Sequence, residues 1–282
     1  MNRSIPMLPD GLVFHQHYLE DTNMHREYPI NATAAIYFSL MDGKRNLGDI
    51  SKIIAQKYQQ DDTSVTRDLE ILSVQLEKHH VLNLRTSWKD WFFVFLISIR
   101  HFLLPHISIW RHEPPQTTSY TKILSWICCI VAKAFLPIMA ILYILFAFLG
   151  AALNMFWIFT GIYVAVYLSI ILSIATHEAG HLAYVRWQKG SNCGFVATRG
   201  PLVYVVCPKL KDKKSTIIAS LIGPISPIII ALLLAVYHFV YGSWIDWFFI
   251  LIFGIHILQF IFPNQDIRNV IGALREQKSL VS

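Results

Sequence analysis

The chain has 282 residues, of which 54% are hydrophobic, with a mean hydropathy of +0.45 and a formal net charge of +6. These values agree with a small membrane core joined to a more polar part. We expect the basic excess to reflect membrane topology and contact with anionic lipid, and no arginine–aromatic pattern indicates a nucleic-acid partner.

Residues 1–88 form a predicted N-terminal domain, because they are rich in charged side chains and contain no apolar run long enough to span a bilayer. Apolar residues at helical spacing predict three helices, over 32–41, 50–58 and 65–76. Extended segments are expected near 11–18 and 81–84, which makes this part a small α+β domain. A domain of this size has a modest core, so binding is a more economical expectation for it than catalysis.

The order of these elements resembles the PqqD-like fold, a peptide-recognition domain of systems that modify ribosomally made peptides. The resemblance covers residues 28–84 and rests on Asn31–Ala34 (NATA) at a helix start, Leu40–Gly43 (LMDG) as a turn, and the two helical segments that follow. It implies a winged-helix-like module that takes a leader peptide as an added strand at its sheet edge. The alternative is a helical cap that only anchors the membrane part.

Residues 89–119 join this domain to the apolar remainder. The stretch from Trp91 to Trp110 is apolar but contains Arg100 and Pro105. A full span would bury Arg100 near the bilayer centre, at a cost of about 2.5 kcal/mol or more. We therefore expect an amphipathic segment in the cytoplasmic interface, with a further span as the alternative, and a linker at Glu113–Gln116 (EPPQ).

Residues 120–282 are predicted to form a helical membrane domain with four spans. Three runs carry no Asp, Glu, Lys or Arg, over 134–176, 215–245 and 247–265. The first run is too long for one span of ~20 residues and predicts two, over 130–153 and 156–176. Turns are expected at Asn154 and at Tyr241–Trp244.

Basic residues predict the orientation of these spans, since Lys and Arg accumulate in cytoplasmic loops. The loop over 186–214 carries seven basic residues and one acidic residue, Asp212. This loop and both termini are therefore expected in the cytoplasm. The chain is predicted to be a multi-pass protein of a bacterial cell membrane.

The second predicted span runs into an HExxH motif, His177-Glu178-Ala179-Gly180-His181. Residues i and i+4 share one face of a helix, so His177 and His181 can direct two imidazoles at one zinc ion. Glu178 then lies beside the metal as the base for an attacking water. Catalytic zinc has three protein ligands and an open position, so a third ligand is required.

Asp266 is the candidate third ligand. It follows Pro263 and Asn264 at the end of the fourth span, and the topology brings this end to the same side of the membrane as the end of the second span. The alternative is an interfacial carboxylate paired with Arg268. Lone histidines within the spans, such as His256, are expected to be structural.

With these features, residues 120–275 resemble the site-2-type intramembrane zinc metalloproteases, the peptidase M50 superfamily. The resemblance rests on HEAGH, on Gly223–Pro227 (GPISP), which is similar to the family's Gly-Pro motif, and on Asp266, where the family has the aspartate of a Leu-Asp-Gly motif. Pro227 stands where the family usually has Asn, and the residues on either side of the aspartate also differ from the family pattern.

The resemblance implies roles for the residues of the site. Zinc would be held by His177, His181 and Asp266, with Glu178 as the catalytic base. The candidate substrate-binding residues are Asn264, which could stabilise the oxyanion, Gly223 and Pro224. In that family the segment after the zinc helix pairs with extended substrate, and residues 193–206 have the β-branched residues and the Arg-Gly-Pro turn of such a hairpin. The alternative for this segment is a plain cytoplasmic loop.

The preferred hypothesis is a membrane-embedded zinc endopeptidase that cleaves a ribosomally made, modified precursor peptide near the cytoplasmic face. Its expected partners are this precursor or its leader peptide, the lipid bilayer, and a peptide-modifying enzyme or exporter. One alternative is a regulated intramembrane protease acting on a membrane-bound regulator, which the peptide-recognition resemblance disfavours. Another is a non-catalytic peptide receptor or export partner, which the intact Glu178 disfavours.

Overall fold

The computed structural model describes residues 4–85, 109–210, 212–262 and 264–278. The interfacial segment predicted over 91–110 lies outside these residues, except for its last two. By their contacts the residues form two units, Met1–Pro114 with Cys193–Val206, and Pro115–Asn192 with Cys207–Ser282. We call them the mixed unit and the helical unit and describe each by itself.

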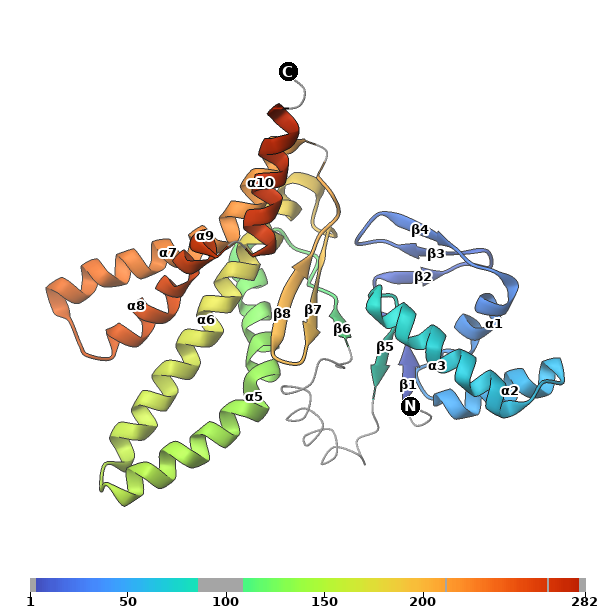
Figure 1. Cartoon of the computed structure of the whole chain (residues 1–282), viewed down its shortest axis with the longest axis horizontal. Helices are drawn as coiled ribbons and strands as arrows, with labels where there is room; N and C mark the ends of the chain where they lie inside the picture. The colour runs from blue at the N-terminus through green and yellow to red at the C-terminus, as the bar shows by residue number, and fades with distance from the viewer. Residues whose placement is uncertain (1–3, 86–108, 211, 263, 279–282) are drawn as a thin grey trace. The chain divides into compact units, whose positions relative to one another are not determined.

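The mixed unit contains helices and short strands (Figure 1). Its helices are α1 (Ala32–Leu40), α2 (Leu47–Tyr58) and α3 (Asp62–Lys78). Its strands are β1 (Ile5–Met7), β2 (Leu12–Phe14), β3 (Tyr18–Asp21), β4 (Arg26–Pro29), β5 (Asn83–Arg85), β6 (Ile109–His112), β7 (Phe195–Arg199) and β8 (Leu202–Val206). They form antiparallel sheets in the orders β1-β5, β2-β3-β4 and β6-β7-β8. The three predicted helices are confirmed within three residues at each end.

Side-chain caps explain where these helices begin. Asn31, Asn46 and Asp61 each accept a hydrogen bond from the backbone N–H three residues later, at 2.8, 2.9 and 3.0 Å. Such caps satisfy backbone donors that have no partner inside the helix. The helices then bury their apolar sides in a common core around Ile50 and Leu82, both 0% exposed.

The hairpin predicted over 193–206 is confirmed, and it belongs to the mixed unit. β7 and β8 pair across a turn at Gly200, whose φ of +59° lies in the left-handed region that glycine adopts readily. The other edge of β7 pairs with β6, from Ile109↔Arg199 to His112↔Val196. β6 is not among the predicted elements, because its residues overlap the end of the stretch interpreted as interfacial and directly precede the predicted linker.

A buried ion pair holds β6 within the mixed unit. The guanidinium of Arg111 donates to both carboxylate oxygens of Asp21, at 2.6 and 3.0 Å, and lies 3.9 Å from the ring centroid of Phe195 on β7. The backbone of Arg111 also exchanges two hydrogen bonds with the side chain of Asn83, at 2.8 and 3.0 Å. Because a buried charge is costly without its partner, these contacts make β6 and β7 part of the same folding unit as β3.

The helical unit contains four helices that are long and apolar enough to cross a membrane, as many as the spans predicted from the charge-free runs. They are α5 (Tyr120–Ala152), α6 (Phe156–Lys189), α7 (Lys213–Tyr241) and a fourth, interrupted segment. This segment consists of α8 (Asp246–Gly254), the 3₁₀ turn η2 (Ile255–Ile257), α9 (Leu258–Ile261) and α10 (Gln265–Lys278). The turn predicted at Asn154 joins α5 to α6, with a left-handed φ of 53°.

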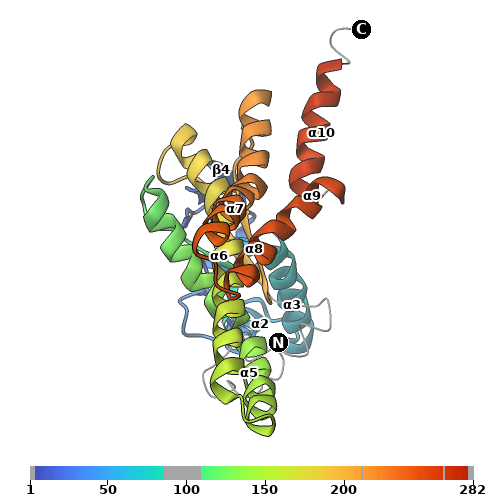
Figure 2. The same cartoon turned by 90° about the vertical axis from the view of Figure 1, so that its left-hand side faces the viewer.

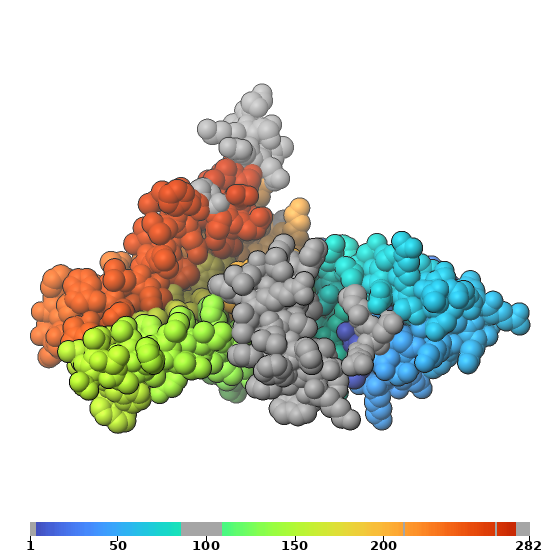
Figure 3. Space-filling model, turned by 60° about the horizontal axis from the view of Figure 1, so that its bottom comes forward, coloured from blue at the N-terminus to red at the C-terminus, as the bar shows by residue number. Residues whose placement is uncertain are grey.

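Helix α6 is the central helix of this unit, since it packs against α5, α7 and α8 (Figure 2). The outer surface is strongly apolar, and Figure 3 shows α5 in green and the α7–α8 part in orange on one face. Phe148, Trp157 and Phe239 are 75%, 81% and 85% exposed. Large apolar side chains in such numbers are typical of a surface that contacts lipid.

Candidate metal site

The two histidines of the HExxH motif lie one turn apart in the second half of α6. The whole stretch from Ala175 to Gly180 is buried by the helices around it. The side chains of His177 and His181 point to the same side of α6, and their Nε2 atoms are 3.2 Å apart. The helix therefore presents two imidazole nitrogens to one point, as the spacing predicts.

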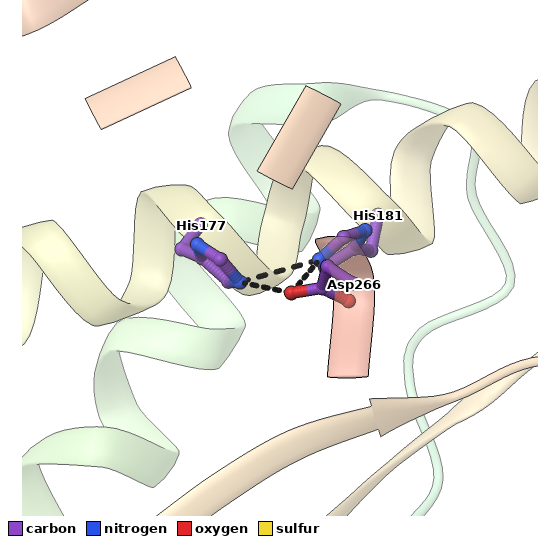
Figure 4. A group of neighbouring side chains, drawn as sticks. All are labelled: His177, His181 and Asp266. Atoms are coloured by element: carbon purple, nitrogen blue, oxygen red, sulfur yellow. Dashed lines mark hydrogen bonds and ion pairs between the residues drawn. The ribbon is translucent and has the colours of Figure 1, made fainter. Parts of the chain in front are cut away.

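Asp266 comes to this point from the first turn of α10 (Figure 4). The side chain of Asn264 accepts a hydrogen bond from the N–H of Ile267 at 3.2 Å, and its carbonyl accepts one from Arg268 at 3.0 Å. Asn264 thus caps α10 and fixes the direction of its first turn. Oδ2 of Asp266 lies 3.3 Å from Nε2 of His177 and 3.5 Å from Nε2 of His181.

These three atoms have the spacing of ligands around a single ion. The triangle between them has sides of 3.2, 3.3 and 3.5 Å. Ligands about 2.0–2.1 Å from a tetrahedral zinc ion are separated by about 3.3–3.4 Å. Within the described residues, His177, His181 and Asp266 form a group that could hold a metal ion, and its two imidazoles and one carboxylate are a donor set used by catalytic zinc.

Glu178 lies next to this triangle rather than in it. Its Oε1 atom is 3.9 Å from Nε2 of His177, and its side chain is 11% exposed. The side chain of Asp266 is 22% exposed, so the group is not completely enclosed. A carboxylate at this distance could serve as the base for a water molecule if the site held a metal ion.

The two histidines are oriented by different contacts. Nδ1 of His181 lies 2.6 Å from the carbonyl oxygen of Ala219 on α7 and donates to it, which leaves Nε2 with its lone pair toward the triangle. Nδ1 of His177 is buried and has no hydrogen-bond partner among the described residues. The ring of His177 instead stacks on His256, with centroids 4.9 Å apart and planes 24° apart.

Gly223 on α7 leaves the space that the ring of His181 occupies. A Cβ atom at this position would lie 2.1 Å from Nε2 of His181. Gly180 on α6 is also close to α7, since a Cβ there would lie 3.0 Å from the carbonyl oxygen of Ile222. The two glycines therefore allow α6 and α7 to approach closely at the site.

The structure also locates the candidate substrate-binding residues. Gly223 borders the site, and Pro224 is buried beside it on α7. The amide of Asn264 donates to Oδ2 of Asp266 at 3.1 Å, so this side chain supports the third candidate ligand. Contact of these three residues with a substrate stays a prediction.

Sequence reasoning assigned His256 only a structural role. A single histidine in an apolar helix carries no spacing signal, and its neighbour His177 is far away in the chain. Its place beside the site depends on the packing of α8 and η2 against α6 and is visible only in three dimensions.

Comparison of the chain with protein-family models, curated proteins and solved structures found no match. Membership of a protease family therefore stays a prediction from the sequence motifs. The structure itself establishes four apolar helices long enough to cross a membrane and, among them, a histidine–histidine–aspartate group that could hold a metal ion.

Proposed function

We propose that this protein is a membrane-embedded zinc endopeptidase of the site-2 type. The observation that carries the proposal is the triangle of His177, His181 and Asp266, with sides of 3.2–3.5 Å and a glutamate at its edge. Its setting supports the same conclusion, because the three residues come from apolar helices long enough to span a bilayer. Ionisable residues inside a membrane are energetically costly and usually mark a functional site.

Each residue of the proposed site has a separate role in peptide hydrolysis. Zinc held by His177, His181 and Asp266 would supply a water of pKa about 7 and would polarise the carbonyl of the peptide bond. Glu178 takes the proton from the attacking water and passes it to the amide nitrogen as the C–N bond breaks. The carbonyl of Ala219 keeps His181 in the tautomer that presents Nε2 to the site.

The position of the site in α6 favours cleavage near the cytoplasmic face. His181 is eight residues from Lys189, the last residue of α6, which corresponds to roughly 12 Å of helix. The basic loop that follows α6 is expected in the cytoplasm. We therefore propose that the scissile bond lies inside the membrane, near its cytoplasmic face. Both termini would lie in the cytoplasm of a bacterial cell.

A short precursor peptide is the proposed substrate, with the mixed unit as its recognition module. A helical substrate shields its peptide bonds from attack, because they are hydrogen-bonded within the helix. The substrate must therefore be extended before it is cleaved. β8 is the last strand of the β6-β7-β8 sheet among the described residues, and we propose that an extended peptide adds to this sheet as a further strand. The PqqD-like order of elements in residues 28–84 favours a leader peptide of a ribosomally made product as the segment recognised.

The proposal is tested with Glu178→Gln, which removes the base and keeps the three ligands. The purified variant should retain the zinc content of the wild type and lose cleavage of a peptide that the wild type cleaves. Glu70→Gln, which makes the same chemical change in the mixed unit, serves as control and should cleave normally. Undiminished cleavage by Glu178→Gln would exclude the hydrolytic mechanism.

Leader recognition is tested in the full-length chain, because a fragment ending at residue 90 would lose Arg111, the partner of buried Asp21. A leader peptide without the cleavage site, added in trans, should raise the apparent KM and leave kcat unchanged. An unchanged KM would contradict recognition of the leader. Cleavage of a membrane-bound regulator by the same preparation would then favour the regulatory protease.

A further inference from the structure

A histidine of the fourth apolar helix lies against the candidate metal site without belonging to the triangle. His256 is 8% exposed, and its ring stacks on that of His177. Its Nε2 atom is 2.9 Å from Oγ of Ser173, one turn before His177 on α6. Both nitrogens of His256 are engaged by other side chains, so neither is directed at the triangle.

A chain of side-chain hydrogen bonds connects His256 to Asp266. The amide nitrogen of Gln259 donates to Nδ1 of His256 at 3.0 Å. The amide nitrogen of Asn264 donates to Oε1 of Gln259 at 3.1 Å and to Oδ2 of Asp266 at 3.1 Å. These directions agree with one tautomer of His256, in which Nε2–H donates to Ser173.

The backbone is adapted to this arrangement. His256 is the middle residue of η2, a 3₁₀ turn that interrupts the fourth helix between α8 and α9. A 3₁₀ turn advances about 120° per residue instead of about 100°, so it changes the face that the following side chains present. His256 is thus placed toward α6, and Gln259 follows it one turn later.

We propose that His256 is a positioning residue for the metal site, acting on two of the three candidate ligands. Its ring fixes the plane of His177, whose Nδ1 has no hydrogen-bond partner among the described residues. Its Nδ1 anchors the amide chain through Gln259 and Asn264 that holds the carboxylate of Asp266. Contacts of this type orient ligands and typically contribute 10–100-fold to metal affinity. The inference rests on the proposed zinc site.

The test compares His256→Ala, His256→Phe and Gln259→Leu in the full-length protein. The alanine variant loses both the stack and the amide chain, whereas the other two lose only the chain. Zinc affinity, measured by competition with a chelator, should fall about 10–100-fold for His256→Ala and less for the other two. His238→Phe is the matched control, because His238 also lies in an apolar helix and pairs with a carboxylate, that of Asp246. It should bind zinc as the wild type does.

A double variant separates positioning through the chain from unrelated structural damage. His256→Phe and Gln259→Leu interrupt the same chain, so their combination should weaken zinc binding no more than either change alone. Additive losses would overturn the proposal. This comparison holds even if His256→Ala fails to fold.

The absorption spectrum of the Co²⁺-substituted protein provides the second readout. His256→Phe should keep the coordination number of the wild type, because His256 is not a ligand; loss of a nitrogen ligand would overturn the positioning role. Zinc binding by the variants within twofold of the wild type would also overturn it while leaving the site intact. Failure of the wild type to bind zinc would instead refute the proposed function itself.

Discussion

Gly223→Ala adds one methyl group at the point where α7 faces His181. The new Cβ would lie 2.1 Å from Nε2 of His181, whereas real contacts of this kind are not shorter than 3.0 Å. The ring or the helix must therefore move by at least 0.9 Å, the difference between these two values. Metal ligands tolerate shifts of only about 0.2 Å, so His181 cannot keep its position in the triangle.

We expect zinc affinity to fall more than about 100-fold in Gly223→Ala, beyond the usual effect of changing a contact behind a ligand. Competition with a chelator of known affinity measures the change. Gly161→Ala is the control, because it adds the same methyl group to α6 where nothing lies within 4 Å. Thermal unfolding of both metal-free variants shows whether the fold survives. A folded Gly223→Ala protein that binds zinc within threefold of the wild type would refute the proposed ligand geometry.

Three further predictions concern stability and topology. Burial raises the pKa of the Glu77 carboxyl group from an ordinary 4.5 to about 7, although a hydrogen bond from the backbone N–H of Ile109 on β6 acts to lower this pKa. Between these two pKa values the folded state keeps a proton that the unfolded state loses, so the stability of the protein should fall as the pH rises from about 4.5 to 7. The melting temperature of Glu77→Gln, measured at pH 5 and 8, should lack this fall. Arg111→Met should destabilise the mixed unit by about 3–5 kcal/mol in denaturant unfolding, because it leaves Asp21 charged and buried, and a second change, Asp21→Leu, should recover much of the loss. In a variant without native cysteines, an impermeant maleimide should label intact cells at Leu153→Cys and not at Lys209→Cys; the reverse pattern would invert the orientation.

The long apolar helices and the site were predictable because their signals are local or follow from topology. Charge-free runs identify the spans, and HEAGH places its histidines on one helix face through the i, i+4 spacing alone. Asp266 was predicted as a neighbour of His177 because an even number of predicted membrane crossings separates them. Its approach to 3.3 Å of the histidine agrees with that prediction.

Features that depend on partners distant in the chain could not be predicted. β6 becomes a strand through pairing with β7 and through the contact of Arg111 with Asp21, and neither partner is adjacent in sequence. The role of Gly223 in making room for His181 likewise requires the crossing of α6 and α7. Hydrophobic patterns describe one element at a time, so the close approach of two elements is not contained in them.

Zinc titration of the metal-free full-length protein tests the central claim that His177, His181 and Asp266 form one metal site. The geometry predicts one tightly bound ion per chain, and no such ion after all three residues are changed to alanine. A wild-type protein that takes up no zinc, or a triple variant that still binds one equivalent as tightly, would contradict it.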